Sequence, residues 1–181
     1  MIRTGPVLGA LAVLVLLVPG GVRADSGSRT YEYFIGAGPL CALAPDACPV
    51  VARSTATGDN VEVSGTGTLT IHPKSVTGGG TFTHKDAVGG VVASGSWTAE
   101  EILSFAGYGT SPGLPSTFEG GKILMRVHLT SAAASFDAVM QVDCLIGKFP
   151  AGAEEGIRLN VQDVLNFNKE VSGLTLYIRV L

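Results

Sequence analysis

Residues 65–84 read GTGTLTIHPKSVTGGGTFTH, and this stretch contains two similar copies of one strand pattern. In each copy threonine alternates with glycine or an apolar residue, and a histidine closes the run. A period of two is typical of a strand that buries one face and exposes the other. The Pro and Gly residues between the copies favour a turn at 74–79, so the stretch predicts a β-hairpin with a threonine-coated outer face.

The same alternation continues on both sides of this hairpin. The clearest further runs are at 61–64, 91–98, 123–130, 136–146, 157–161 and 174–180. Weaker strands are expected at 28–35 and 50–57, and turns are expected at 86–90 and 166–173. About eight strands with short connections predict an all-β antiparallel sandwich or barrel, and the pattern leaves both architectures open.

The period changes after Trp97. Thr98 with Glu101 three residues later fits a capping box, and Phe105 would lie on the inner face, so one short helix is expected at 98–106. Residues 107–121, rich in Gly, Pro and Ser, then predict a long surface loop. The remaining glycine clusters are interpreted as turns, because they lack the third glycine and the strand-to-helix context of a phosphate loop.

The N-terminus has the pattern of a secretory signal peptide. Arg3 precedes an apolar run at 7–18 that is too short to span a membrane, and Pro19 with two glycines ends it. Ala24 fits the cleavage preference of a signal peptidase, so we expect residues 1–24 to be removed, rather than kept as an anchor. Residues 25–181 would then form one exported domain, secreted or periplasmic, without a membrane span.

Three cysteines remain after that cleavage, Cys41, Cys48 and Cys144, and they allow one disulfide and one free thiol. Proximity in the chain favours the bridge between Cys41 and Cys48, with a bridge from either one to Cys144 as the alternative. If Cys144 is free, its place on an apolar strand face predicts a small buried side chain and not a nucleophile.

The charge of the chain excludes one class of partner. Loss of the signal peptide would change the net charge from −3 to about −5, which leaves no basic face for nucleic acid. A polysaccharide, a protein or a small apolar ligand remain as partners, and the threonine-coated strand face would allow a flat contact with the first two.

A metal site is the sharpest chemical hypothesis. Imidazole and carboxylate ligands would suit zinc, copper or non-haem iron, and the candidate set is His84, Asp86 and His128. The pleat places His84 with Phe82 and His128 with Arg126, however. The sequence therefore favours a hydrogen-bonded histidine at a strand end over a metal ligand, and it predicts no cofactor.

The sequence does not locate a catalytic nucleophile, so no Ser/His/Asp assignment is made. Asp137 and Asp143 fall on the outer face of their strand. Glu100 and Glu101 fit the first turn of the expected helix. These positions favour exposed or capping roles, so a non-catalytic protein is expected.

A closed barrel of this size could also hold one small apolar molecule. The candidate lining is aromatic and consists of Trp97, Phe105, Tyr108, Phe118 and Phe136. The same residues are expected in an ordinary filled core, so the two hypotheses differ in whether the interior is empty.

Residues 71–84, the segment Gly95-Ser96-Trp97-Thr98-Ala99 and the tail at 167–176 resemble a group of small exported bacterial proteins of uncharacterised function. The resemblance covers most of the expected mature chain. It implies a single exported domain and brings no catalytic or binding residue with it. The expected function is thus binding or a role in the cell envelope, with a small-ligand barrel or a metal-dependent enzyme as alternatives.

Overall fold

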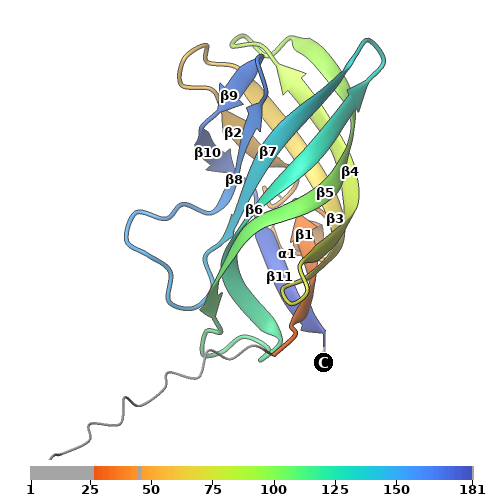
Figure 1. Cartoon of the computed structure of the whole chain (residues 1–181). Coiled ribbons are helices and arrows are strands. Elements are labelled where there is room, and N and C mark those ends of the chain that lie inside the picture. The colour runs from red at the N-terminus through yellow and green to blue at the C-terminus, as the bar shows by residue number, and fades with distance from the viewer. Residues whose placement is uncertain (1–26, 45, 181) are drawn as a thin grey trace, which may run out of the picture.

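The computed structural model describes residues 27–44 and 46–180, which form eleven strands and one short helix (Figure 1). The elements are β1 (Thr30–Ile35), α1 (Leu40–Leu43), β2 (Val50–Arg53), β3 (Asn60–Thr70), β4 (Ser75–Lys85), β5 (Val91–Gly109), β6 (Phe118–Ser131), β7 (Ser135–Cys144), β8 (Gly156–Val161), β9 (Leu165–Phe167), β10 (Lys169–Ser172) and β11 (Thr175–Val180). The all-β prediction is confirmed. The predicted signal peptide lies outside the described residues.

Six strands form a closed ring of hydrogen-bonded neighbours, in the order β3, β1, β11, β6, β5, β4 and back to β3. All of these pairings are antiparallel. Strands β7, β8 and β9 continue from β6, and β2 and β10 continue from β3. The ring gives the fold a barrel-like wall, whose strands run obliquely to its long axis (Figure 1).

A buried ion pair joins the two extensions of the ring. Arg158 of β8 places its Nε 2.8 Å from Oε1 of Glu170 on β10, and the side chain of Glu170 is only 3% exposed. Strands β8 and β10 share no hydrogen-bonded ladder. Side chains thus close this part of the wall, where backbone hydrogen bonds do not.

Four connections gather at one end of the barrel, at residues 54–59, 86–90, 132–134 and 162–164 (Figure 1). We call this the loop end. The β3–β4 turn and the β5–β6 connection lie at the opposite end. Because adjacent strands are antiparallel, every second connection returns to the loop end.

The indole of Trp97 lies across two glycines of the neighbouring strands. In the register Gly65 of β3 faces Gly80 of β4, which faces Trp97 of β5. A Cβ on Gly65 would meet the indole ring, with Cε2 of Trp97 only 2.9 Å away. The indole is almost fully buried and its Nε1 donates to the backbone oxygen of Ser64 at 3.1 Å. The missing side chains therefore create the space that Trp97 fills.

Tyr33 uses a second pair of glycines in the same way. It faces Gly67 of β3, which faces Gly78 of β4. A Cβ on Gly67 would lie 2.5 Å from the Tyr33 hydroxyl oxygen, which donates to the backbone oxygen of Thr77 at 2.9 Å. Tyr33 comes from β1, which pairs with β3, and Trp97 comes from β5, which pairs with β4. Both aromatic rings thus pack onto the glycine-rich part of the hairpin.

The prediction of a turn at 74–79 is wrong. Strand β4 begins at Ser75, so the turn occupies residues 71–74 and the run Gly78–Gly80 lies inside the strand. Glycine is a signal both for tight turns and for close approach of a side chain to the backbone. The sequence alone does not distinguish these uses, because the aromatic rings come from other strands.

The predicted helix at 98–106 is also wrong, since these residues belong to β5. The β5–β6 register shifts three times, after Ala99, Ile102 and Gly107. Each shift is a bulge or irregularity that changes which residue points inward. The residues that pack against the interior are therefore spaced by three, at Ala99, Ile102 and Phe105. That spacing resembles the period of a helix. The one helix of the described residues, α1, lies elsewhere.

The predicted hairpin of the second half is confirmed, whereas two predicted connections are shorter than expected. The long hairpin of the second half is confirmed as β6 and β7, with Met125 facing Met140 and both side chains buried. The expected loop at 107–121 shrinks to 110–117, because β5 and β6 extend into it. The expected turn at 166–173 contains β10 and the last two residues of β9.

The disulfide between Cys41 and Cys48 is confirmed, with a Cα–Cα distance of 5.3 Å. The bridged segment includes α1 and packs Leu40 against Leu176 on the outer side of β1 and β11, in a small apolar cluster separate from the barrel interior. Cys144 is free and buried, and burial raises the pKa of its thiol to about 12. A thiol in this environment is not an activated nucleophile.

Candidate apolar binding site

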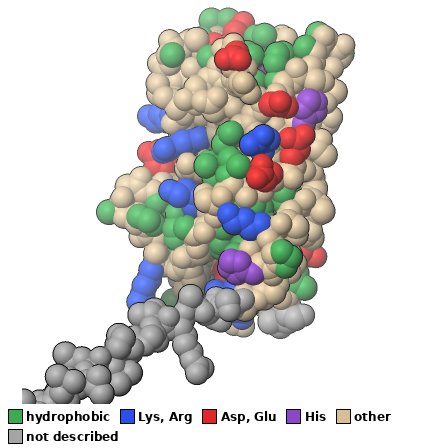
Figure 2. Space-filling model, in the orientation of Figure 1, with side chains coloured by type: hydrophobic (Ala, Val, Ile, Leu, Met, Phe, Trp, Pro, Cys, Tyr) green, Lys and Arg blue, Asp and Glu red, His purple; other side chains and the backbone are tan. Residues whose placement is uncertain are grey.

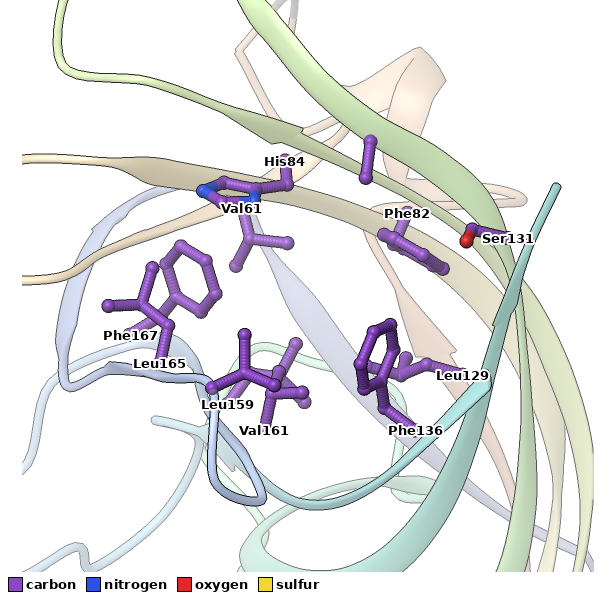
Figure 3. Close-up of a pocket in the computed structure, with 12 residues that line it drawn as sticks. Val61, Phe82, His84, Leu129, Ser131, Phe136, Leu159, Val161, Leu165 and Phe167 are labelled. Carbon is purple, nitrogen blue, oxygen red and sulfur yellow. The ribbon is translucent and has the colours of Figure 1, made fainter. Parts of the chain in front are cut away.

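A cavity of about 60 Å³ opens at the loop end of the barrel, and its walls are almost entirely apolar (Figure 3). Strands β3 to β9 contribute to it. It is lined by Val61, Phe82, His84, Ala93, Leu129, Ser131, Phe136, Leu159, Val161, Val164, Leu165 and Phe167.

The pleat of the strands aims these side chains inward. Phe82 and His84 are alternate residues of β4, so both point to the interior, and Val61 faces His84 across the β3–β4 ladder. On the other side, Leu159 of β8 faces Phe167 of β9. The wall residues therefore come from strands distant in sequence that the barrel brings to one end.

His84 is the one titratable side chain among the lining residues. Its Nε2 lies 2.9 Å from Oδ2 of Asp59, and both side chains are 19% exposed. The imidazole also packs nearly perpendicular to the Phe167 ring, with ring centroids 5.3 Å apart. The ring is thus fixed by a carboxylate on one side and an aromatic ring on the other.

Ser131 does not complete a catalytic triad with this pair. Figure 3 shows Ser131 and His84 on different sides of the cavity, with Phe82 between them. The Ser131 hydroxyl instead donates to the backbone oxygen of Ala134 at 2.9 Å, within the β6–β7 turn. The hydroxyl therefore has a structural partner.

Exposed valines occur at the same end of the barrel as the cavity. Val164, at 57% exposure, both lines the cavity and faces solvent. Val88, Val91 and Val92 in and beside the β4–β5 connection are also exposed. An exposed apolar group next to an apolar hollow is a common feature of interaction sites.

The predicted ligand-lining residues are separated in the structure. Phe136 lines the cavity. Trp97 is in the filled core, Phe105 packs on Tyr31 and Tyr177 in the interior, Tyr108 bonds to Asp143, and Phe118 joins the outer cluster near α1.

The candidate metal ligands are not brought together. His84 faces the cavity and pairs with Asp59, whereas His128 pairs with Asp137 at 2.9 Å on β6 and β7. Asp86 accepts hydrogen bonds from backbone N–H groups of its own turn. Residues 27–44 and 46–180 contain no group of three or more His, Cys, Asp and Glu that could hold a metal ion.

Sequence reasoning missed most of the cavity wall. Val61, Leu159 and Phe167 were recognisable as inward-facing or apolar, but their meeting point depends on strand order and register. Asp59 stands in a turn next to β3, and its pairing with His84 follows from a register that places His84 beside Val61. The sequence shows the type of each of these residues, but it does not show that the fold brings them together.

A second set of polar side chains is buried towards the opposite end. Asp143 has an exposure of 3% and accepts a hydrogen bond from the Tyr108 hydroxyl at 2.9 Å. Burial, followed by this bond, raises the pKa of Tyr108 to about 12. The exposed role expected for Asp143 is wrong, because its carboxylate is buried and bonded to Tyr108 and Gln141.

Glu155 connects three elements in the same region. Its carboxylate accepts hydrogen bonds from the backbone N–H of Leu145 and of Thr175, both at 2.7 Å. Burial raises the pKa of Glu155 above the usual value. The side chain therefore satisfies buried backbone donors at the cost of desolvating its own charge.

Glu155→Gln is expected to lower the free energy of unfolding by about 1–3 kcal/mol at pH 5, because the amide directs a donor at a backbone N–H. The loss should be smaller at pH 7. A carboxyl group whose pKa is raised on folding loses stabilising effect as the pH rises through that pKa, whereas glutamine does not titrate. Denaturant unfolding at both pH values tests this, with Glu100→Gln on exposed β5 as control. An equal loss at the two pH values would contradict it.

Comparison with protein-family models, curated proteins and solved structures finds no match. Within residues 27–44 and 46–180, no helix has the length and apolar composition needed to cross a membrane. The assignment of a function therefore rests on the geometry of the chain itself.

Proposed function

We propose that the protein is an exported, non-catalytic binding domain that receives an apolar group of its ligand or partner at the loop end. The observation that carries this proposal is the open apolar cavity, with Val164 and other exposed valines at the same end. Burying apolar surface is the main favourable contribution to most associations.

The size of the cavity limits what it receives. A volume of about 60 Å³ is small beside the roughly 300–1,000 Å³ of sites that enclose a whole small molecule. The interior below it is filled by large side chains such as Trp97, Tyr33 and Tyr177. The occupant we propose is therefore the end of an acyl chain or one apolar side chain of a partner protein.

A binding role fits the chemistry of the walls better than catalysis does. His84 is held by Asp59, and the Ser131 hydroxyl is used in a turn. The other lining residues are apolar and offer no group that orients or activates a reacting atom.

Two features support export. The N-terminal pattern predicts a cleaved signal peptide, and the Cys41–Cys48 disulfide is compatible with an oxidising compartment. The proposed site of action is outside the cytoplasm, either in solution or on a component of the cell envelope.

Titration of the ¹⁵N-labelled protein with 1-butanol and 1-hexanol should move the amide signals of residues around the cavity. Ala93→Leu extends a side chain into the space and is expected to weaken binding about tenfold or more. Loss of about two buried methylene contacts, at roughly 0.8 kcal/mol each, corresponds to that factor. NMR chemical shifts measure both the position and the affinity.

Two further variants complete this test. Val164→Ser, at an exposed position on the cavity, should weaken binding and leave the fold unchanged. Ala42→Leu makes the same substitution in α1, away from the cavity, and should bind like the wild type. Equal binding by Ala93→Leu, Val164→Ser and the wild type would refute the proposed site.

A further inference from the structure

The outer face of β6, β7 and β8 carries two neighbouring polar hollows that the apolar site does not use. The upper hollow, of about 330 Å³, is lined by Arg126, Asn160 and Gln162 among others. The lower one, of about 170 Å³, includes Gln141 and Arg158. Figure 2 views the molecule as in Figure 1, where β6 and β7 cross the front, and shows charged and hydrophobic side chains interspersed there.

The register makes the two hollows parts of one track. Arg126, Val139 and Asn160 stand side by side across the three strands, and Gln141 with Arg158 forms the next row. Rows two residues apart along a strand are separated by roughly 7 Å. A chain-like ligand running along the strands would therefore pass from one hollow to the other.

The charges lining the two hollows balance. Three side chains are cationic and three are anionic: Lys122, Arg126, Arg158, Asp137, Asp143 and Glu154. Nucleic acid and anionic membranes require an excess of positive charge, which this face lacks. A balanced surface with many donors and acceptors instead matches a neutral ligand that both donates and accepts hydrogen bonds.

The lower hollow has a fixed acceptor in its wall. Asp143 is almost fully buried, and its carboxylate is oriented by the Tyr108 hydroxyl and the Gln141 amide. Lys122 stands opposite Asp143 in the register and lines the same hollow. The Asp143 carboxylate can accept a hydrogen bond from one ligand hydroxyl group, and Lys122 can donate a hydrogen bond to the adjacent one.

We infer that the outer face of β6, β7 and β8 binds a neutral glycan chain, with successive sugar units in the two hollows. The hydroxyl groups of such a chain supply donors and acceptors without net charge. Val139, in the wall of the upper hollow, offers an apolar contact to the carbon face of a sugar. This interaction is separate from the apolar cavity at the loop end.

The test is an NMR titration of the ¹⁵N-labelled protein with cellohexaose, maltohexaose and chitohexaose. At least one of these neutral chains should shift the amides of β7 and β8 around Val139 and Asn160. Asn160→Ala and Arg126→Ala, both at exposed positions, should each weaken that chain about fivefold, as expected for one lost hydrogen bond. The wild-type cavity signals around Phe167 should not move.

Thr81→Ala on the exposed threonine face of β4 is the matched control and should bind like the wild type. The inference is overturned if none of the three chains shifts β7 and β8 at millimolar concentration. It is equally overturned if Thr81→Ala, and not Asn160→Ala, weakens binding, because the glycan would then lie on the threonine face. Stronger, salt-dependent binding of a hexagalacturonate probe would also contradict it.

Discussion

Replacing Trp97 by alanine is expected to lower the free energy of unfolding by about 3–5 kcal/mol, as for other large buried aromatic residues. The indole is 2% exposed and fills the space above the glycines of β3 and β4. Truncation leaves a cavity there and removes the donor to the Ser64 carbonyl. Guanidinium denaturation followed by far-UV circular dichroism measures the loss.

Val92→Ala is the control for this substitution. Val92 lies on the same strand, but its side chain is 58% exposed. Its replacement should change the free energy of unfolding by less than about 0.5 kcal/mol. Similar effects of Trp97→Ala and Val92→Ala would mean that the indole is not part of the barrel interior.

Gly65→Ala is expected to destabilise the protein by about 1–3 kcal/mol, although alanine is only one methyl group larger. The new Cβ would contact the Trp97 ring and lie 2.6 Å from the backbone oxygen of Gly79. The Trp97 ring, the backbone of β4 at Gly79, or both would therefore have to move. The same denaturation experiment measures the effect.

Gly107→Ala is the matched glycine substitution. Its new Cβ would lie 3.5 Å from Phe105, at an ordinary van der Waals distance, so a small effect is expected. Combining Gly65→Ala with Trp97→Ala should cost less than the sum of the two, by at least about 0.5 kcal/mol, because they share one contact. Strict additivity would contradict packing of the indole on Gly65.

Much of the fold was predictable because one face of most strands is buried. The alternation around Met125 and Met140 is regular and predicts their strands correctly. Short separation along the chain likewise predicts the Cys41–Cys48 bridge. These features depend on local sequence alone.

The errors have a common physical origin in contacts between distant strands. The irregularities in β5 after Ala99 and Ile102 produce a spacing of three that imitates a helix. The glycines at Gly78–Gly80 serve packing by Trp97 and Tyr33, which nothing in the hairpin sequence reveals. In such a strand the same residue, glycine, can indicate either a turn or the close packing of an aromatic ring.

The candidate site was less predictable than the fold. Phe136 alone of the expected lining residues reaches the cavity, because the others point into the filled interior or bond elsewhere. The His84–Asp59 pair requires the β3–β4 register, which shifts if the turn is misplaced by a few residues. A cavity that collects side chains from seven strands depends on the closure of the barrel.

The titration with 1-hexanol tests the central functional claim most directly. We expect saturable shifts of amide signals at Val61, Phe82, Leu159 and Phe167, and loss of these shifts in Ala93→Leu. Saturable binding that leaves these four residues unchanged, or no saturable binding at all, would contradict an apolar binding site at the loop end of the barrel.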